Sequence, residues 1–315
     1  MGKIFGVIAA SLLLLTGGTA ALAQEATPAA GGGATFADTM GLPELAITAS
    51  DSAFEGVPSE TAAGRYVVTL TNAASEDAAV EFLQLPEGIT IDALSGPPPG
   101  AEGTPAADGG DEGGDSGPPP WYYSTYMAGG PGAGAGQTVQ AIVDLKPGTY
   151  AVWADDPEAA QAPVALTVTG EMPSDLAEPV ADVTVNEVGT NDGFMFELDG
   201  DLAVGEQTLK VYNHSDQPHF FLLYKSPGEI TEEQVQTLLT FDPSSGTPLP
   251  EGYPDPDAFE TAAYTSTMSA GAISYLAADL DAGYYVALCF VGDPNKGGVP
   301  HAREGMAQIF TVGDV

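Results

Sequence analysis

Two stretches of the chain repeat one pattern: Gly136–Ala154 reads GQTVQAIVDLKPGTYAVWA, and Gly271–Cys289 reads GAISYLAADLDAGYYVALC. They align without a gap, and the shared residues are Gly136/Gly271, Asp144/Asp279, Leu145/Leu280, Gly148/Gly283 and Tyr150/Tyr285. Short runs of β-branched and aromatic residues around a glycine are typical of two strands joined by a turn. The repeat therefore predicts strands that recur in two halves of the chain.

Working outward from this pair, the flanking segments match as well. Tyr66–Asn72 corresponds to Gln207–Asn213, and the halves close on final strands at Val164–Thr169 and Gln308–Val312. We therefore expect an all-β protein of two tandem β-sandwich domains, 41–170 and 180–315, an ordinary domain size.

One helix is predicted inside the second domain. Thr231-Glu-Glu-Gln234 forms a capping box, in which the Thr hydroxyl and the Gln side chain satisfy free backbone amides. Val235, Leu238 and Leu239 then supply an apolar face. This is a short helix inserted between strands.

The N-terminus is typical of a secretory signal peptide over residues 1–23. Lys3 is followed by the apolar run Ile4–Leu15 and by Ala21-Leu22-Ala23, which predicts cleavage before Gln24. An uncleaved N-terminal anchor is the alternative. We expect an exported protein that is periplasmic, on the cell surface or extracellular, without a membrane span after cleavage. Residues 24–40 are expected to be a flexible lead, and 96–120 a low-complexity loop.

The composition excludes several classes of function. Seven Lys and Arg against 44 Asp and Glu give a formal net charge of −37, which argues against nucleic acid and anionic membranes as partners. Such a surface favours a redox partner protein with a basic surface. One Cys and three His exclude a disulfide framework and most His-rich metal clusters.

The scarce metal-binding side chains gather in the second half. Cys289 ends a predicted strand, His301 and Met306 follow it, and His219 lies in the turn Asn213–His219. A thiolate, two imidazoles and a thioether are the ligands of a mononuclear type 1 copper site. Taken singly, each residue is more commonly structural, but the order in which all four occur favours copper ligation.

Here the chain resembles the cupredoxins, the plastocyanin/azurin-like blue copper family. The resemblance rests on Asn-x4-Pro-His at Asn213–His219, on Cys…His-x3-Gly-Met at Cys289–Met306 and on the turn Asp279–Tyr285. It implies Greek-key sandwiches, one copper ion held by His219, Cys289, His301 and axial Met306, and one-electron transfer rather than an enzyme activity.

The chain departs from the family pattern in one place. Eleven residues, 290–300, separate Cys289 from His301, more than the few that are usual, and such a loop could admit water or a small ligand to the metal. The loop holds no second Cys, which disfavours a binuclear site. His214 lies outside the pattern and is interpreted as an exposed turn residue.

The first half serves as an internal control. Ala78 stands at the position of His219 and Ala154 at that of Cys289, and residues 41–170 contain neither His nor Cys. We expect this half to bind no copper and to be structural or to present a partner surface.

Two other functions remain open at this point. The protein could be a cupredoxin-like binding or surface module without redox function, or a copper carrier. A multicopper oxidase is disfavoured, because its trinuclear centre needs many more than three His.

Overall fold

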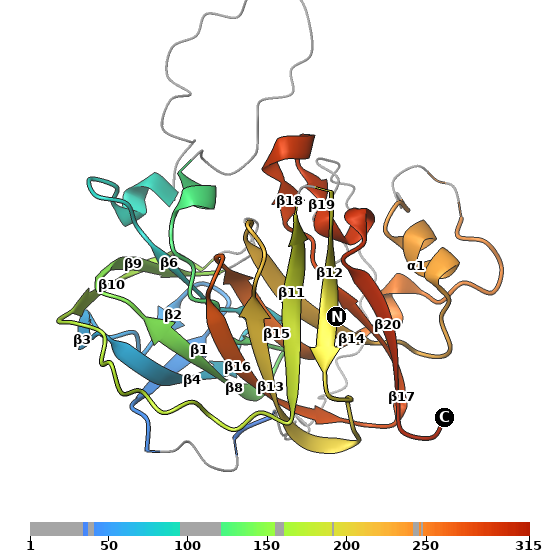
Figure 1. The fold of residues 1–315 in the computed structure, drawn as a ribbon, viewed down its shortest axis with the longest axis horizontal. Helices are drawn as coiled ribbons and strands as arrows, with labels where there is room; N and C mark the ends of the chain where they lie inside the picture. Colours follow the sequence, from blue (N-terminus) through green and yellow to red (C-terminus); the bar gives the residue numbers. More distant parts are fainter. Residues whose placement is uncertain are drawn as a thin grey trace, which may run out of the picture.

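A computed structural model describes residues 34–36, 41–94, 121–154, 161–190, 192–241, 246 and 248–315. In this part of the chain the protein is all-β, with a single α-helix (Figure 1). The strands of the first half are β1 (Glu44–Ala49), β2 (Phe54–Glu55), β3 (Glu60–Ala62), β4 (Gly64–Asn72), β5 (Ala78–Ala79), β6 (Glu81–Gln84), β7 (Gly132–Ala133), β8 (Thr138–Leu145), β9 (Gly148–Trp153) and β10 (Val164–Thr169). Those of the second half are β11 (Val183–Thr190), β12 (Gly193–Asp199), β13 (Gly205–Asn213), β14 (His219–Lys225), β15 (Glu260–Met268), β16 (Ile273–Leu280), β17 (Gly283–Leu288), β18 (Gly292–Asp293), β19 (Val299–Pro300) and β20 (Ala307–Val312).

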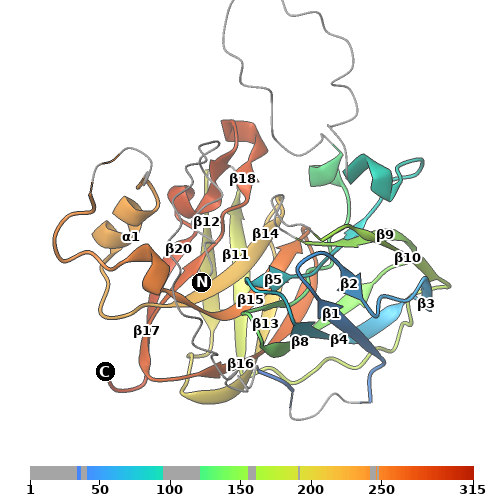
Figure 2. The same cartoon turned by 180° about the vertical axis from the view of Figure 1, so that it is seen from behind.

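One large sheet runs through both halves of the molecule. Its eight strands follow the order β12-β11-β13-β16-β8-β4-β1-β2, so four come from each half. Each half adds a second sheet of four strands, β3-β10-β9-β6 in the first and β15-β14-β17-β20 in the second. Figure 2 shows the two halves side by side from behind, with β8 and β16 of the shared sheet where they meet.

The strands that meet at the centre of the large sheet are the two copies of the repeated pattern. β8 and β16 pair antiparallel, with Ser274 opposite Val143 and Leu276 opposite Ala141. In the sequence alignment Leu276 is itself the counterpart of Ala141. The halves are therefore related by a local two-fold axis at this pair, as in a symmetric dimer interface.

A second set of contacts joins the halves through residues 125–131. The backbone amide of Gly129 donates to Thr267 O at 3.1 Å, and Ser266 N donates to Gly130 O at 2.8 Å. Ser266 is fully buried, and its hydroxyl donates to Val80 O at 2.9 Å. These bonds satisfy buried polar groups of both halves, so neither half presents this face to water.

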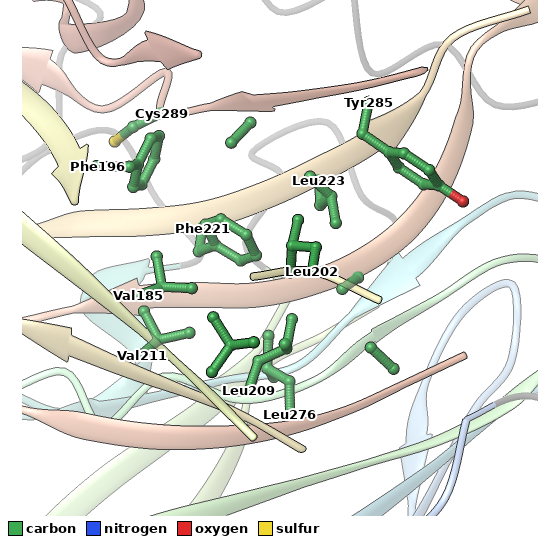
Figure 3. Packing of buried hydrophobic residues seen from close by; sticks show 14 of the residues in the cluster. Val185, Phe196, Leu202, Leu209, Val211, Phe221, Leu223, Leu276, Tyr285 and Cys289 are labelled. Carbon is green, nitrogen blue, oxygen red and sulfur yellow. The ribbon is translucent and has the colours of Figure 1, made fainter. Parts of the chain in front are cut away.

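Each half buries its own hydrophobic core between its two sheets. In the second half, side chains of β11, β12, β13 and β16 pack against those of β14, β15, β17 and β20. Figure 3 shows this cluster, with Cys289 and Phe196 at one end and Tyr285 at the other. Along most of β11 and β13, fully buried residues alternate with half-buried ones, and this period of two directs the buried side chains inward.

Two structural devices recur in both halves at matching positions. Asn72 and Asn213 are fully buried at the ends of β4 and β13. The amide of Asn72 donates to Glu76 O at 2.8 Å and to Ala133 O at 2.9 Å, and that of Asn213 to Gln217 O at 2.8 Å and to Met268 O at 2.9 Å. The Tyr150 and Tyr285 hydroxyls each donate to a backbone carbonyl four residues upstream, at 2.9 Å.

The helix predicted inside the second domain is present. The capping box is confirmed: α1 (Glu232–Leu238) begins after Thr231, whose hydroxyl accepts from Gln234 N, and it buries Val235 and Leu238. The predicted signal peptide, the loop 96–120 and most of the lead 24–40 lie outside the described residues. Among the described segments, none of the helices is long and apolar enough for a bilayer crossing. The domain limits and the Greek-key connectivity stay predictions.

Candidate metal centre

His219 is held at the start of β14 by the turn that leaves β13. The Asn213 side chain donates to the Gln217 carbonyl, and its oxygen accepts from Ser215 N at 2.9 Å and Ser215 Oγ at 2.8 Å. An Asn that bonds nearby backbone groups stabilises a tight turn. The turn thus places the imidazole of His219 at the end of the sandwich.

Cys289 directly follows β17, and the chain beyond it folds back onto the same spot. Cys289 N donates to Met306 O at 3.2 Å, and Ala302 N donates to Cys289 O at 2.7 Å. His301 N donates to Val291 O at 2.9 Å. These backbone bonds bring His301 beside Cys289 in spite of the long loop between them.

Three donor atoms converge there. His219 Nδ1 lies 3.6 Å from Cys289 Sγ, His301 Nδ1 lies 3.8 Å from that sulfur, and the two Nδ1 atoms are 2.8 Å apart. All three side chains have 0% of their surface exposed. Two imidazole nitrogens and one thiolate in contact are the equatorial donor set of a type 1 copper site, so the residues fit that ion.

Burial keeps both imidazoles neutral, which is the form that binds a metal. Desolvation lowers the pKa of His219 to about 2, with a further lowering from His301. Desolvation also lowers the pKa of His301 to about 4, although the Asp293 carboxylate opposes the effect. At neutral pH the nitrogen lone pairs are therefore available.

Met306, the fourth predicted ligand, is fully buried in the same core cluster as Cys289. Its backbone bonds both Cys289 and His301, since Met306 N donates to His301 O at 2.9 Å. These bonds hold the backbone of Met306 beside Cys289 and His301, and axial ligation by its sulfur remains a prediction.

Phe194 of β12 closes the site on the side of the large sheet. Its ring centroid lies 4.8 Å from that of His219 and 4.3 Å from that of His301. The Phe194 side chain is 1% exposed. It therefore keeps water from the two imidazoles and limits their rotation.

The loop 290–300 forms an ordered cover for the site. β18 and β19 pair as a hairpin, and the Asp293 side chain accepts from Asn295 N to begin a turn of 3-10 helix, Pro294–Lys296. Gly297 adopts a left-handed conformation, with φ of +69°, where glycine is favoured. In Figure 1 this hairpin stands at the top of the second half. The loop is longer than the family pattern, yet it leaves His301 fully buried.

Hydrogen bonds link His301 to this cover through Gln217. His301 Nε2 lies 3.1 Å from Gln217 Oε1, and Gln217 Nε2 donates to Asp293 Oδ1 at 3.0 Å. Lys296 Nζ lies 3.6 Å from Asp293 Oδ2 and 2.7 Å from Glu304 Oε1. Sequence reasoning missed Gln217 and Asp293, because motif spacing marks the ligands and not the residues that orient them.

Glu187 is a further residue that the sequence did not indicate. It is fully buried on β11 opposite Asn213, and both of its carboxylate oxygens lack a hydrogen-bond partner. Desolvation raises its pKa to about 8. In the first half the residue opposite Asn72 is Ala49.

His214 is exposed, stacks on Tyr212 with ring centroids 3.6 Å apart and lies outside the donor cluster. Ala78 and Ala154 are buried in the core cluster of the first half, at 8% and 7% exposure. Among the described residues of the first half, no group of three metal donors is found.

Comparison with known proteins gives matches to solved structures alone. No protein-family model matches the chain, and no curated protein does. An auracyanin from the photosynthetic bacterium Roseiflexus castenholzii is 21% identical, with 42% of this chain and 95% of that chain covered and a TM-score of 0.26. Auracyanin A, a "blue" copper protein from Chloroflexus aurantiacus, is 20% identical, with 41% and 98% covered and a TM-score of 0.25.

A similarity spanning both halves is found to a copper nitrite reductase from Nitrosomonas europaea, 11% identical, with 86% of this chain and 94% of that chain covered and a TM-score of 0.22. Values this low add nothing to the assignment of the site, which rests on the donor atoms themselves. In that donor set, His219, Cys289 and His301 with Met306 alongside, the chain resembles the blue copper cupredoxins.

Proposed function

We propose that this protein is an exported type 1 copper protein that transfers single electrons, with one copper ion held by His219, Cys289, His301 and Met306. The observation that carries the proposal is the fully buried contact of two imidazole nitrogens with one thiol sulfur. Bound copper would supply a one-electron couple, which soft sulfur and imidazole donors support in both oxidation states.

The enclosure of the site favours electron transfer over catalysis on a bound substrate. His219, Cys289, His301 and Met306 are each 0% exposed. Phe194 packs against both imidazoles, and the loop 290–300 contacts His301 through the Val291 carbonyl. A small ligand could reach the metal only by displacing packed side chains. An electron needs no such opening.

The charge of the chain bears on its partner. A net charge of −37 favours a redox partner with a basic surface, whose association rate should fall as salt rises. Export is part of the proposal through the predicted signal peptide over residues 1–23.

Loading the purified protein with Cu(II) and recording its visible spectrum tests the proposal. We expect an intense thiolate-to-copper band that Cys289→Ala abolishes and that added nitrite or azide leaves unchanged. A colourless protein whose melting temperature ignores copper would instead identify a binding module without redox function. Weak, exchangeable copper without redox cycling would identify a carrier.

A further inference from the structure

The two histidines of the site differ in what holds the nitrogen that faces away from the donor cluster. His219 Nε2 is buried without a hydrogen-bond partner. His301 Nε2, in contrast, lies 3.1 Å from the side-chain oxygen of Gln217. The orientation of His301 is therefore set by hydrogen bonding as well as by packing.

The direction of each hydrogen bond follows from the chemistry of the groups. The Asp293 carboxylate only accepts, so the Gln217 amide turns its NH2 group toward Asp293 Oδ1, at 3.0 Å. This leaves Gln217 Oε1 facing His301, where it can only accept. His301 must then carry its proton on Nε2, and the lone pair of Nδ1 faces Cys289 and His219.

The Asp293 carboxylate is itself held in place. Its Oδ1 accepts from Asn295 N at 2.8 Å, and Lys296 Nζ lies 3.6 Å from its Oδ2. Gln217 is 5% exposed and Asp293 is 0% exposed, so water does not compete with these contacts. Lys296 Nζ also lies 2.7 Å from Glu304 Oε1, so its ammonium group balances the charge of both carboxylates, Asp293 and Glu304.

We infer that Gln217 is the positioning residue of the metal site: it transfers the fixed orientation of Asp293 to the imidazole of His301. The inference rests on the proposed function for its effect on copper. Its effect on the tautomer of His301 does not depend on the metal. A partner of this kind, which orients a ligand from outside the coordination shell, is commonly worth about 10–100-fold in metal affinity.

The test compares Gln217→Met with a matched control, Gln207→Met. Gln207 is also a buried glutamine, 8% exposed, whose amide donates to Ala203 O at 2.6 Å. It lies near the opposite end of β13 from Asn213, about 20 Å away at the usual rise per strand residue. Both variants lose a buried amide, but only the first loses a contact with His301.

Two measurements are made on each protein. In the metal-free protein, the imidazole nitrogen shifts give the tautomer, and three His keep this spectrum simple. We expect His301 to carry its proton on Nε2 in the wild type and in Gln207→Met, and a mixture of tautomers in Gln217→Met. In the copper-loaded protein, we expect Gln217→Met alone to weaken Cu(II) binding by about 10–100-fold and to change the reduction potential.

A charge-conserving exchange keeps the inference falsifiable if Gln217→Met does not fold. In the double variant Gln217→Glu with Asp293→Asn, the new amide donates to the new carboxylate, which still accepts from His301 Nε2. We expect the wild-type tautomer in this protein. A proton on Nδ1 of His301 in the wild type or in the exchanged variant, or unchanged tautomer and affinity in Gln217→Met, would overturn the inference. A tautomer change in a protein that binds no copper would overturn the proposed function and leave the inference standing.

Discussion

The two halves of this molecule share a framework and differ at one end of the sandwich. Asn72 and Asn213 make matching hydrogen bonds, and the hydroxyls of Tyr150 and Tyr285 each donate to the carbonyl four residues upstream. At the end beyond the asparagines, the second half has His219 and Cys289 where the first has the alanines 78 and 154. The residues that stabilise the fold are thus separate from those that provide chemistry, so a site can be present or absent on one framework.

The halves also differ in how the chain continues after the repeated strands, β8–β9 in the first half and β16–β17 in the second. Only nine residues, 155–163, lie between Ala154 and β10, whereas seventeen, 290–306, lie between Cys289 and β20. The longer connection is what supplies His301, Asp293 and Met306. Replacing Ala78 by His and Ala154 by Cys would therefore not recreate the complete donor set, because the first half lacks counterparts of His301 and Met306.

The largest effect is expected from a substitution where the halves meet. A Cβ at Gly130 would lie 2.0 Å from Val80 O, a backbone atom that cannot move aside easily, and the φ of Gly130 is +155°. We expect Gly130→Ala to lower the free energy of unfolding by about 3 kcal/mol. Because the halves share a sheet, Trp fluorescence, which reports Trp121 and Trp153 of the first half, and the copper band should still change in one transition.

Gly136→Ala is the control for this prediction, because Gly136 also has a positive φ, +77°, but no atom lies within 4 Å of the added Cβ. It should cost about 1 kcal/mol. Two separate transitions in either protein would show that the halves unfold independently.

The paired asparagines give the next largest effect. Asn72→Ala and Asn213→Ala each leave buried backbone groups without partners, and each should lower the free energy of unfolding by about 2–3 kcal/mol. Only Asn213→Ala should also alter the copper spectrum, because Asn213 holds the turn that carries His219. Denaturant unfolding and visible spectra of both variants test this, and a copper site disturbed equally by Asn72→Ala would contradict it.

A pH-dependent effect is expected from Glu187, which replaces Ala49 of the first half. In the folded protein, burial raises the pKa of Glu187 from its ordinary value of 4.5 to about 8. Between these values the unfolded chain releases the proton and the folded chain keeps it, so stability falls as pH rises from about 4.5 to 8.

Glu187→Gln removes this dependence, since the amide is neutral at every pH. We expect it to stabilise the metal-free protein by about 2 kcal/mol at pH 8 and by much less at pH 5. Melting temperatures at the two pH values provide the measurement. An equal effect at both values would argue against a titrating Glu187.

The smallest effect is expected from the hydroxyl groups of Tyr150 and Tyr285. Tyr150→Phe and Tyr285→Phe each remove one hydrogen bond to a backbone carbonyl, of 2.9 Å in both cases. Each should cost about 1 kcal/mol, and because the sites are independent the double variant should cost the sum. Unequal losses of unfolding free energy would show that the two hydrogen bonds differ in strength although their lengths are equal.

Much of the fold was predictable because strand pairing follows local patterns. The gapless repeat 136–154 and 271–289 appears as β8–β9 and β16–β17, and the capping box at Thr231 begins α1. The sharing of one sheet by both halves was not predicted. Antiparallel pairing of β8 with β16 depends on complementary edges meeting in space, and no local spacing records that.

The sequence by itself determined which residue types the site can use: it contains one Cys and three His, and their order placed three of these four residues together. Only the tertiary structure decided how they are held. The loop 290–300 covers the site instead of opening it, and Gln217 and Phe194 both contact His301. Both results depend on how side chains from different strands pack at one end of the sandwich. Such contacts join residues far apart in the chain, so their physical cause is the packing of the whole fold rather than any local pattern.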